Sequence, residues 1–416
     1  MTVLSPDRLH PRLAIPATSV GIALTAGIFF LANGGLYRFP GPNGALWLLA
    51  TAMVGFWFLR SPLGMARMLL GFWPAMLFPL IALLSALWSS APGATLGEAV
   101  QLLVTILICL RIGSLLTTKA TMLALALAMT LGVVATVANI ATGFLPPVYE
   151  VNGALLGIFP QKTVVARIVF LAAFAIVALG LLHRRPLPAI IIAAGMFPLV
   201  SMAKSVTGEI GYLFIGLLVG LFALRNLPIG ARVLLPVLAL LTLAALTLIY
   251  VATGGALLAD LLALAGKNST LTGRTLLWDI GLGIAGDSPL VGIGYEAFWT
   301  SPTYALAVSE IYATVDDGLH GFHNAYIEAY VATGLIGLAA LVWMQVLAWT
   351  RLLRVWLVTR SVQAAIWLAL LTAICLLAVI DDTLLKPRSG FMMLTIIAYV
   401  WSVRLTAATR SPSWSD

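Results

Sequence analysis

The sequence predicts an all-α, polytopic membrane protein with about twelve transmembrane helices and one long loop on the outer side. Two observations predict this fold class. Hydrophobic residues make up 61% of the 416 positions and charged residues only 9%, which excludes an ordinary soluble domain. Apolar runs of roughly 20 residues, the length that a helix needs to cross a bilayer, recur along nearly the whole chain.

The predicted spans occupy most of the chain outside residues 253–324. A short basic stretch with Arg8 and Arg12 precedes the first span; no small-residue cleavage site follows it, which favours an anchor over a signal peptide. The spans are predicted at 13–31, 43–59, 68–88, 95–116, 120–142, 163–182, 187–203, 208–224, 231–252, 325–349, 362–380 and 390–405. The chain therefore divides into residues 1–252 with nine spans, a loop of residues 253–324 and residues 325–416 with three spans.

The distribution of basic residues predicts the orientation. With a cytoplasmic N-terminus, 15 of the 23 Lys and Arg residues fall on the inner side and 8 on the outer side, as the positive-inside rule requires. Both termini are then cytoplasmic, and residues 253–324 face the periplasm or exterior. Topology thus explains the net charge of +8, and we expect no nucleic acid partner. Cys109 and Cys375 lie within apolar runs and indicate neither a disulfide nor a metal site.

Within the loop, residues 274–286 are predicted to form an amphipathic helix. Its apolar face consists of Leu276, Leu277, Ile280 and Ile284, and Thr272 is its candidate cap. Residues 288–295 then predict a turn with a tight backbone path. Gly292 and Gly294 either allow close approach to a ligand or simply allow the chain to bend.

His323 and Asn324 stand at the head of the span that begins at residue 325. Free N–H groups and the helix dipole at such a position favour anions, and a histidine exchanges a proton near neutral pH. The position predicts a general base beside an anion site. The alternative is an interfacial histidine that only caps the helix.

His320 precedes His323 by three residues, so a metal pair is a competing interpretation. Asp316 and Asp317 would be the nearest carboxylate ligands. No cysteine or third histidine stands nearby, and the spacing matches no strong zinc signature. We therefore expect no metal and no cofactor.

Further basic residues lie at the outer ends of other spans. Lys162 and Arg167 begin the sixth span, and Lys204 follows the seventh. Charge at membrane depth usually faces an internal cavity, and Arg and Lys together suit a pyrophosphate. The alternative for each residue is snorkelling to lipid headgroups. The last outer loop holds Asp381, Asp382, Lys386 and Arg388, for which an ion-paired structural rim is favoured over a catalytic role.

Several short motifs follow one another in order along the chain. They are Leu84-Ser85-Ala86-Leu87-Trp88-Ser89 with Thr95-Leu96, Gly157-Ile158-Phe159-Pro160-Gln161-Lys162, Leu271-Thr272-Gly273-Arg274-Thr275-Leu276-Leu277-Trp278, Pro289-Leu290-Val291-Gly292-Ile293-Gly294-Tyr295 with Phe298-Trp299, and His323-Asn324 with Thr333-Gly334-Leu335-Ile336-Gly337. In this order the sequence resembles bacterial O-antigen ligases and polymerases, and it is similar to their exopolysaccharide-polymerase branch. Where that family often carries Ser-Arg, Ser205 is followed here by Val206, and Lys204 precedes it.

The resemblance implies a metal-independent glycosyltransferase of the GT-C type in the bacterial inner membrane, with its active site facing the periplasm. It implies that His323 is the catalytic histidine and that Arg274 contacts the diphosphate of a polyprenyl-linked glycan. Lys162, Arg167, Lys204 and Asn324 are the further candidates for diphosphate binding. Tyr295, Trp299 and His320 are candidate contacts to the acceptor or sugar.

The leading hypothesis is polymerisation of lipid-linked repeat units into a surface polysaccharide, with His323 as general base. A ligase that transfers the glycan to lipid A core or to protein is the nearest alternative, and a flippase or other transporter of lipid-linked glycans is the second. Expected partners are the lipid-linked glycan, the acceptor glycan or lipid A core, and membrane lipids. A chain-length regulator or other polysaccharide-assembly proteins would be further partners.

Overall fold

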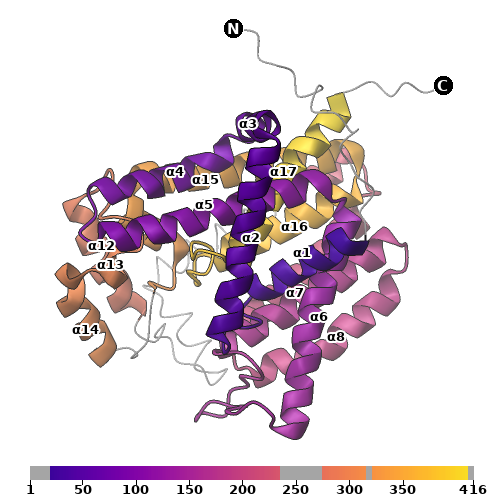
Figure 1. The fold of residues 1–416 in the computed structure, drawn as a ribbon. Helices are drawn as coiled ribbons and strands as arrows, with labels where there is room; N and C mark the ends of the chain where they lie inside the picture. The colour runs from indigo at the N-terminus through magenta and orange to yellow at the C-terminus, as the bar shows by residue number, and fades with distance from the viewer. Residues whose placement is uncertain (1–18, 235–273, 315–320, 411–416) are drawn as a thin grey trace.

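The computed structural model describes residues 19–234, 274–314 and 321–410, and these fold almost entirely as α-helices (Figure 1). Within these ranges the extended pairing is limited to an isolated bridge between Tyr149 and Leu155. Seven of the described helices are long and apolar enough to cross a membrane, and one bent pair of helices would add an eighth. The chain is therefore a multi-pass, all-α membrane protein, while the number of about twelve spans stays a prediction.

The helices of the first part of the chain are α1 (Ser19–Ala32), α2 (Pro40–Arg60), α3 (Pro62–Gly71), α4 (Pro74–Leu84), α5 (Pro92–Leu115), α6 (Thr118–Thr142), α7 (Lys162–Leu182), α8 (Pro186–Met202) and α9 (Val206–Leu224), with a 3-10 turn η3 (Ser85–Leu87) after α4. The predicted loop holds α12 (Arg274–Asp287), α13 (Ala297–Thr300), η4 (Pro302–Tyr304) and α14 (Ala305–Thr314). The last helices are α15 (Ala325–Thr359), α16 (Val362–Leu377) and α17 (Gly390–Arg410). Most predicted spans coincide with these helices, and the predicted amphipathic helix is α12. The predicted span 231–252 lies mostly outside the described residues.

The predicted span 68–88 is wrong as one straight helix. The chain instead forms α3 and α4, whose axes differ by 101°. The helix breaks at Phe72 and Trp73 because Pro74 has no N–H to continue the hydrogen-bond ladder of α3. Met65 and Met68 on α3 are buried, whereas Leu63, Arg67 and Leu70 are exposed.

Helix α7 lies at the centre of one group of helices. It packs against α6, α8 and α9, and Figure 1 shows α6, α7 and α8 side by side. Its buried face is rich in alanine, as at Ala172 and Ala173, and Gly208 of α9 approaches Ala166 closely. Small residues permit the close backbone packing that holds helices together in a bilayer, where hydrophobic burial gives little driving force.

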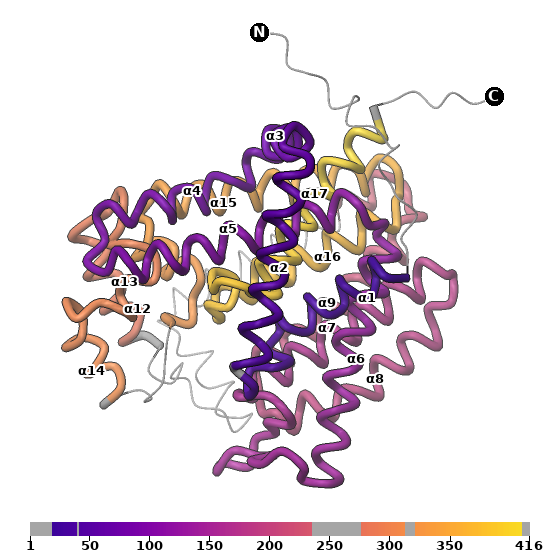
Figure 2. Tube along the Cα trace, viewed as in Figure 1, coloured from indigo at the N-terminus to yellow at the C-terminus, as the bar shows by residue number. Residues whose placement is uncertain are grey.

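A second group consists of α4, α5, α15 and α17, which pack against one another. Figure 2 shows α12 and α13 gathered at one end of α4, α5 and α15. Hydrogen bonds join the connections that the charge distribution assigned to the outer side. We call the helix ends that these connections link the outer end. Hydrogen bonds join Arg38 to Phe159, Lys204 to Asn152 and Ala325 to Ala378. At the opposite end, Arg404 donates to the carbonyl of Gly113 and Arg232 to that of Leu357. Which end faces the periplasm stays a prediction.

Helix α15 is interrupted at Gly334, where residues 289–294 insert into it. In an unbroken helix the N–H groups of Leu335 and Ile336 would donate to the carbonyls of Val331 and Ala332. Here those two carbonyls accept from Ile293 and Gly294, each at 3.0 Å. The freed N–H groups of Leu335 and Ile336 donate to Pro289 and Leu290, at 2.8 and 3.1 Å. The inserted segment therefore supplies partners for two carbonyls and two N–H groups that the interruption leaves without helical partners.

Two glycines make this backbone contact possible. Gly334 has φ +64° and ψ −168°, a region that only glycine adopts readily. A Cβ atom at Gly334 would overlap the backbone of Leu290, and one at Gly292 would overlap the backbone around Thr333. Gly292 and Gly334 lie in two different sequence motifs and form the two sides of one backbone contact. We call the contact between residues 289–294 and the break in α15 the α15 joint. On the other side of the segment, Trp88 Nε1 donates to the Gly292 carbonyl at 3.1 Å.

We predict that Gly334→Ala destabilises the protein strongly. Backbone strain alone should cost about 1–3 kcal/mol, and the new methyl group would also displace Leu290. The free energy of unfolding, measured for purified protein in detergent by titration with a denaturing surfactant, is the appropriate readout.

Gly216→Ala in α9 is the matched control, because nothing lies within 4 Å of an added Cβ there. Alanine at such a helix position is expected to be neutral or to stabilise by about 0.5–1 kcal/mol. Equal losses in the two variants would contradict the proposed role of the joint.

Candidate active site

The predicted loop builds a small apolar core of its own against the start of α15. Leu277 and Ala285 of α12, Phe298 of α13 and Ile311 of α14 are buried in it together with Phe322. Trp278 Nε1 donates to the Phe322 carbonyl at 2.9 Å, and Gly281 lies against the Phe322 ring. The helix that begins at Arg274 is therefore fixed to the residue immediately before His323.

His323 lies in the turn that leads into α15. Its φ of +49° places it in the left-handed region, which is uncommon for a residue with a side chain. It interacts electrostatically with Asp382 of the connection between α16 and α17. A Cβ atom at Gly321 would overlap the Asp382 carboxylate. The connection between α16 and α17 thus packs directly against the histidine segment.

Asn324, a predicted diphosphate-binding residue, is the N-cap of α15. Its Oδ1 accepts from the N–H groups of Tyr326 at 3.0 Å and Ile327 at 3.1 Å, a typical cap geometry. The Ala325 N–H donates to the Ala378 carbonyl, and the Glu328 N–H donates to the Asn324 carbonyl. All four first-turn N–H groups are thus used within the chain. The head of α15 does not present the open anion site expected from the sequence.

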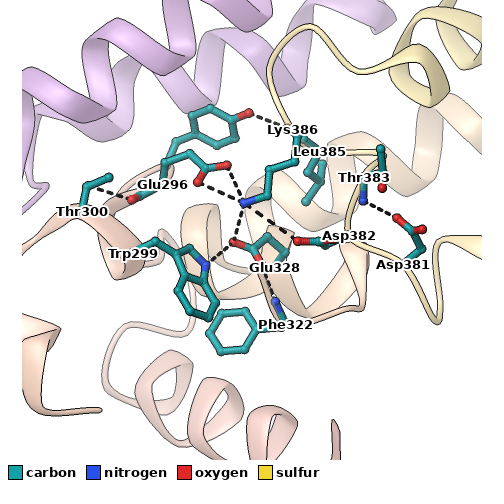
Figure 3. A network of polar contacts seen from close by, with 11 residues as sticks. Glu296, Trp299, Thr300, Phe322, Glu328, Asp381, Asp382, Thr383, Leu385 and Lys386 are labelled. Carbon is teal, nitrogen blue, oxygen red and sulfur yellow. Dashed lines mark hydrogen bonds and ion pairs between the residues drawn. The ribbon is translucent and has the colours of Figure 1, made fainter. Parts of the chain in front are cut away.

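A buried cluster of charges surrounds Lys386, which also belongs to the connection between α16 and α17 (Figure 3). Its Nζ lies 3.2 Å from each Glu296 carboxylate oxygen and 3.9 Å from Glu328 Oε1 and Asp382 Oδ2. Side-chain exposure is 26% for Lys386 but only 6% for Glu328. We call these four residues the Lys386 cluster. It joins the start of α13, the first turns of α15 and the connection before α17.

The cluster perturbs the titration of its members in that connection. Burial alone would lower the pKa of Lys386, but the carboxylates of Glu296, Glu328 and Asp382 outweigh it and raise that pKa. Burial raises the pKa of Asp382, although Lys386 and His323 oppose the shift. Lys386 is therefore firmly held in its charged form.

The sequence interpretation identified only part of this cluster. The predicted ion-paired rim is confirmed for Asp382 and Lys386, but the closer partner is Glu296. Glu296 and Glu328 had no assigned role, because their distance of about 60 to 90 residues from Lys386 hides the contact. The sequence did offer one indication of their role. Glu296 and Glu328 lie between residues of the family motifs, and a carboxylate in such an apolar setting needs a partner.

Arg167 is a predicted phosphate-binding cation whose charge interacts with one member of this cluster, Asp382. It is only 8% exposed, and its Nη1 donates to Thr383 Oγ1 at 2.7 Å. Asp381 and Asp382 both interact with its charge. Its Nε is buried and has no hydrogen-bond partner. Arg167 and His323 thus contact neighbouring residues of one connection, and the guanidinium keeps one donor unused.

Lys162 and Lys204 gather elsewhere on the outer end. Lys162 pairs with Glu150 at 3.1 Å, with about a third of each side chain exposed. Lys204 Nζ donates to the Asn152 carbonyl at 2.7 Å. Both lysines therefore bind the segment around residues 150–152. Their described partners, Glu150 and Asn152, do not belong to the Lys386 cluster.

The remaining predicted residues are Tyr295, Trp299, Arg274 and His320. Tyr295 is fully buried; its N–H donates to Ser85 Oγ and its hydroxyl to the Leu385 carbonyl, so it belongs to the core and does not face an acceptor. Trp299 is partly exposed and donates from Nε1 to Glu328 Oε1 at 2.9 Å. Arg274 begins α12, but its side chain lies outside the described part of the chain, as does the whole of His320.

The metal alternative also involves residues outside the described ranges, namely Asp316 and Asp317. Over residues 19–234, 274–314 and 321–410, no group of three or more His, Cys, Asp and Glu side chains is arranged to hold a metal ion. The arrangement around His323 instead offers a histidine beside a carboxylate, with a buried arginine close by. Such groups can accept a proton and stabilise negative charge.

Two comparisons with known proteins place these residues in context. A family model described as O-antigen ligase matches residues 191–342, a range that includes the α15 joint and His323. Over 138 residues the chain is 44% identical to "Exopolysaccharide production protein ExoQ" of Rhizobium meliloti (strain 1021), which is 32% of this chain and 31% of that protein. The aligned part spans about a third of the length of this curated relative. The resemblance seen in the motifs is confirmed over these ranges.

We predict that Lys386→Met destabilises the protein by about 3–5 kcal/mol, because three largely buried carboxylates lose their counter-charge. Lys162→Met is the control; its pair with Glu150 is partly exposed and should contribute at most about 1 kcal/mol. Unfolding free energies of both variants in detergent test this. Equal small losses would show that the Lys386 cluster contributes no more than a surface pair.

Proposed function

Because residues 191–342 match the O-antigen ligase family model, we propose that this chain is a membrane glycosyltransferase that polymerises polyprenyl-diphosphate-linked oligosaccharide repeat units into a surface polysaccharide. The observation that supports this most is the position of His323. The Trp278 that ends the arginine-containing motif bonds the residue before this histidine. Asp382 interacts electrostatically with both His323 and Arg167.

In the proposed reaction, the nonreducing-end hydroxyl of one repeat unit attacks the anomeric carbon of another. A new C–O glycosidic bond forms, the bond from the anomeric carbon to the phosphate oxygen breaks, and polyprenyl diphosphate leaves. His323 takes the hydroxyl proton, a contribution of about 10²- to 10⁴-fold in rate. The Asp382 carboxylate favours the imidazolium that results.

The leaving diphosphate gains negative charge and needs cations placed to receive it. Arg167 supports this role because its buried Nε has no partner in the chain. Arg274, at the start of α12, is the second proposed contact. Lys162 and Lys204 contribute if the glycan carrier replaces Glu150 and the Asn152 carbonyl as their partners. Asn324 uses its Oδ1 in the helix cap, so its amide nitrogen is the group left for a phosphate.

The proposed setting is the bacterial inner membrane, with the outer end in the periplasm and both chain termini in the cytoplasm. The donor is a polyprenyl-diphosphate-linked glycan and the acceptor a second such glycan. No metal or other cofactor takes part in this scheme. Transfer to lipid A core is the second candidate, since the matched family is described as O-antigen ligase; it uses the same chemistry with a different acceptor.

Incubation of the purified protein with lipid-linked repeat units should yield longer glycans, resolved by gel electrophoresis or mass spectrometry. Polymerisation needs only one substrate class, so product should form without any core lipid. Transfer that occurs only after lipid A core is added would favour the ligase. Absence of both products with fully folded protein would contradict both enzyme proposals and favour a transporter.

His323→Ala should lower turnover by at least about 10²-fold, because the acceptor hydroxyl loses its general base. His183→Ala is the matched control; His183 is exposed at the end of α7 and its Nδ1 contacts the Leu179 carbonyl. It should retain full activity. Unchanged turnover in the His323 variant, with normal membrane insertion, would remove the general-base assignment.

A further inference from the structure

Phe322, the residue that precedes His323, is held at both of its main-chain polar groups. The Phe322 N–H donates to Glu328 Oε2 at 2.9 Å, and the Phe322 carbonyl accepts from Trp278 Nε1 at 2.9 Å. The Phe322 ring is fully buried, with the Trp299 ring centroid 5.2 Å away. His323 itself has φ +49°, a strained value for a residue with a side chain. Its conformation therefore depends on what holds Phe322.

Glu328 of α15 accepts the hydrogen bond from the Phe322 N–H. It stands four residues after the N-cap Asn324, and its carboxylate extends back past the helix end. Oε2 accepts from Phe322, and Oε1 accepts from Trp299 Nε1 at 2.9 Å. Lys386 Nζ lies 3.9 Å from the same Oε1. The side chain is 6% exposed, so water does not readily replace these partners.

The two contacts require a carboxylate. A glutamine side chain has one acceptor oxygen and an amide group that only donates. In its place, either the Phe322 N–H or the Trp299 N–H would face another donor. A residue that served only to cap α15 would not need two acceptor atoms, because Asn324 already performs that function.

We propose that Glu328 is a positioning residue, which sets the orientation of His323 by holding the main-chain N–H of Phe322. The inference rests on the proposed function, in which His323 is the general base. Displacement of a catalytic group by about 1 Å can cost 10²-fold in rate even when the substituted residue is remote from the reacting atoms. A merely structural role would lower the stability of the protein and leave the turnover of folded molecules unchanged.

The test compares full-length Glu328→Gln with the wild type, both reconstituted in lipid and checked for folding. With lipid-linked repeat units as substrate, kcat should fall about 10- to 100-fold while KM stays within about threefold, since binding groups are untouched. A second readout is the NMR signal of the His323 ring in protein with ¹³C-labelled histidine. The chain has four histidines, and loss of one signal in His323→Ala assigns it. This signal should shift in Glu328→Gln.

Glu296→Gln is the matched control. It removes a carboxylate that faces the same Lys386, but Glu296 makes no described contact with Phe322. Its kcat should stay within about threefold of the wild-type value, and the His323 signal should not move. Glu328→Asp keeps two acceptor oxygens on a shorter side chain and should recover part of the activity.

Two outcomes would overturn the proposal. One is a folded Glu328→Gln protein with wild-type turnover and an unshifted His323 signal. The other is an equal fall in kcat for Glu296→Gln, which would assign the effect to the charge of the Lys386 cluster. The NMR readout needs no activity: if His323→Ala remained fully active, the general-base assignment would fail, while a shifted signal in Glu328→Gln would still uphold positioning.

Discussion

The exchange of backbone hydrogen bonds at Gly334 is the interaction on which the outer end of the molecule depends. Lipid supplies no partners for unpaired N–H and C=O groups, so a helix can be interrupted at membrane depth only where protein replaces the missing bonds. Residues 289–294 provide that replacement on both sides of the break. The segment of α15 that follows, residues 335–359, is about 37 Å long at 1.5 Å per residue. It can cross a hydrocarbon core of roughly 30 Å unaided, which leaves residues 325–333 available to the loop.

This joint also locates the groups of the candidate active site. Residues 289–294 connect the end of α12 to the start of α13, so a fixed position for them fixes Trp278 on one side and Glu296 on the other. Both residues then reach toward the start of α15, Trp278 by bonding Phe322 and Glu296 through Lys386. The histidine segment is thus held by contacts from α12, α13, α15 and the connection before α17. The contacts from α12, α13 and α15 lie in or beside different sequence motifs, so motifs that are distant in the chain meet at the histidine segment.

The sequence predicted those features that depend on local pattern. The apolar runs predicted the helices, and the spacing of Leu277, Ile280 and Ile284 predicted α12. It did not predict the bend between α3 and α4, because the hydrophobic run continues through Trp73. Nor did it predict the paired N–H groups at the head of α15 or the Lys386 cluster. The bond from Ala325 to Ala378 and the contacts of Lys386 with Glu296 and Glu328 join residues about 50 to 90 positions apart, which no single-sequence periodicity records.

The separation of charge around His323 constrains how a donor and an acceptor can approach it. Three carboxylates of the Lys386 cluster face one lysine, so the cluster has an excess of negative charge and repels a diphosphate. Arg167 is a buried cation whose charge interacts with Asp382, and Asp382 also interacts with His323. In the proposed reaction the diphosphate therefore approaches from the α7 side, where Arg167 has an unused donor. The acceptor hydroxyl then meets His323, and the Asp382 carboxylate stabilises the imidazolium formed as the proton is taken.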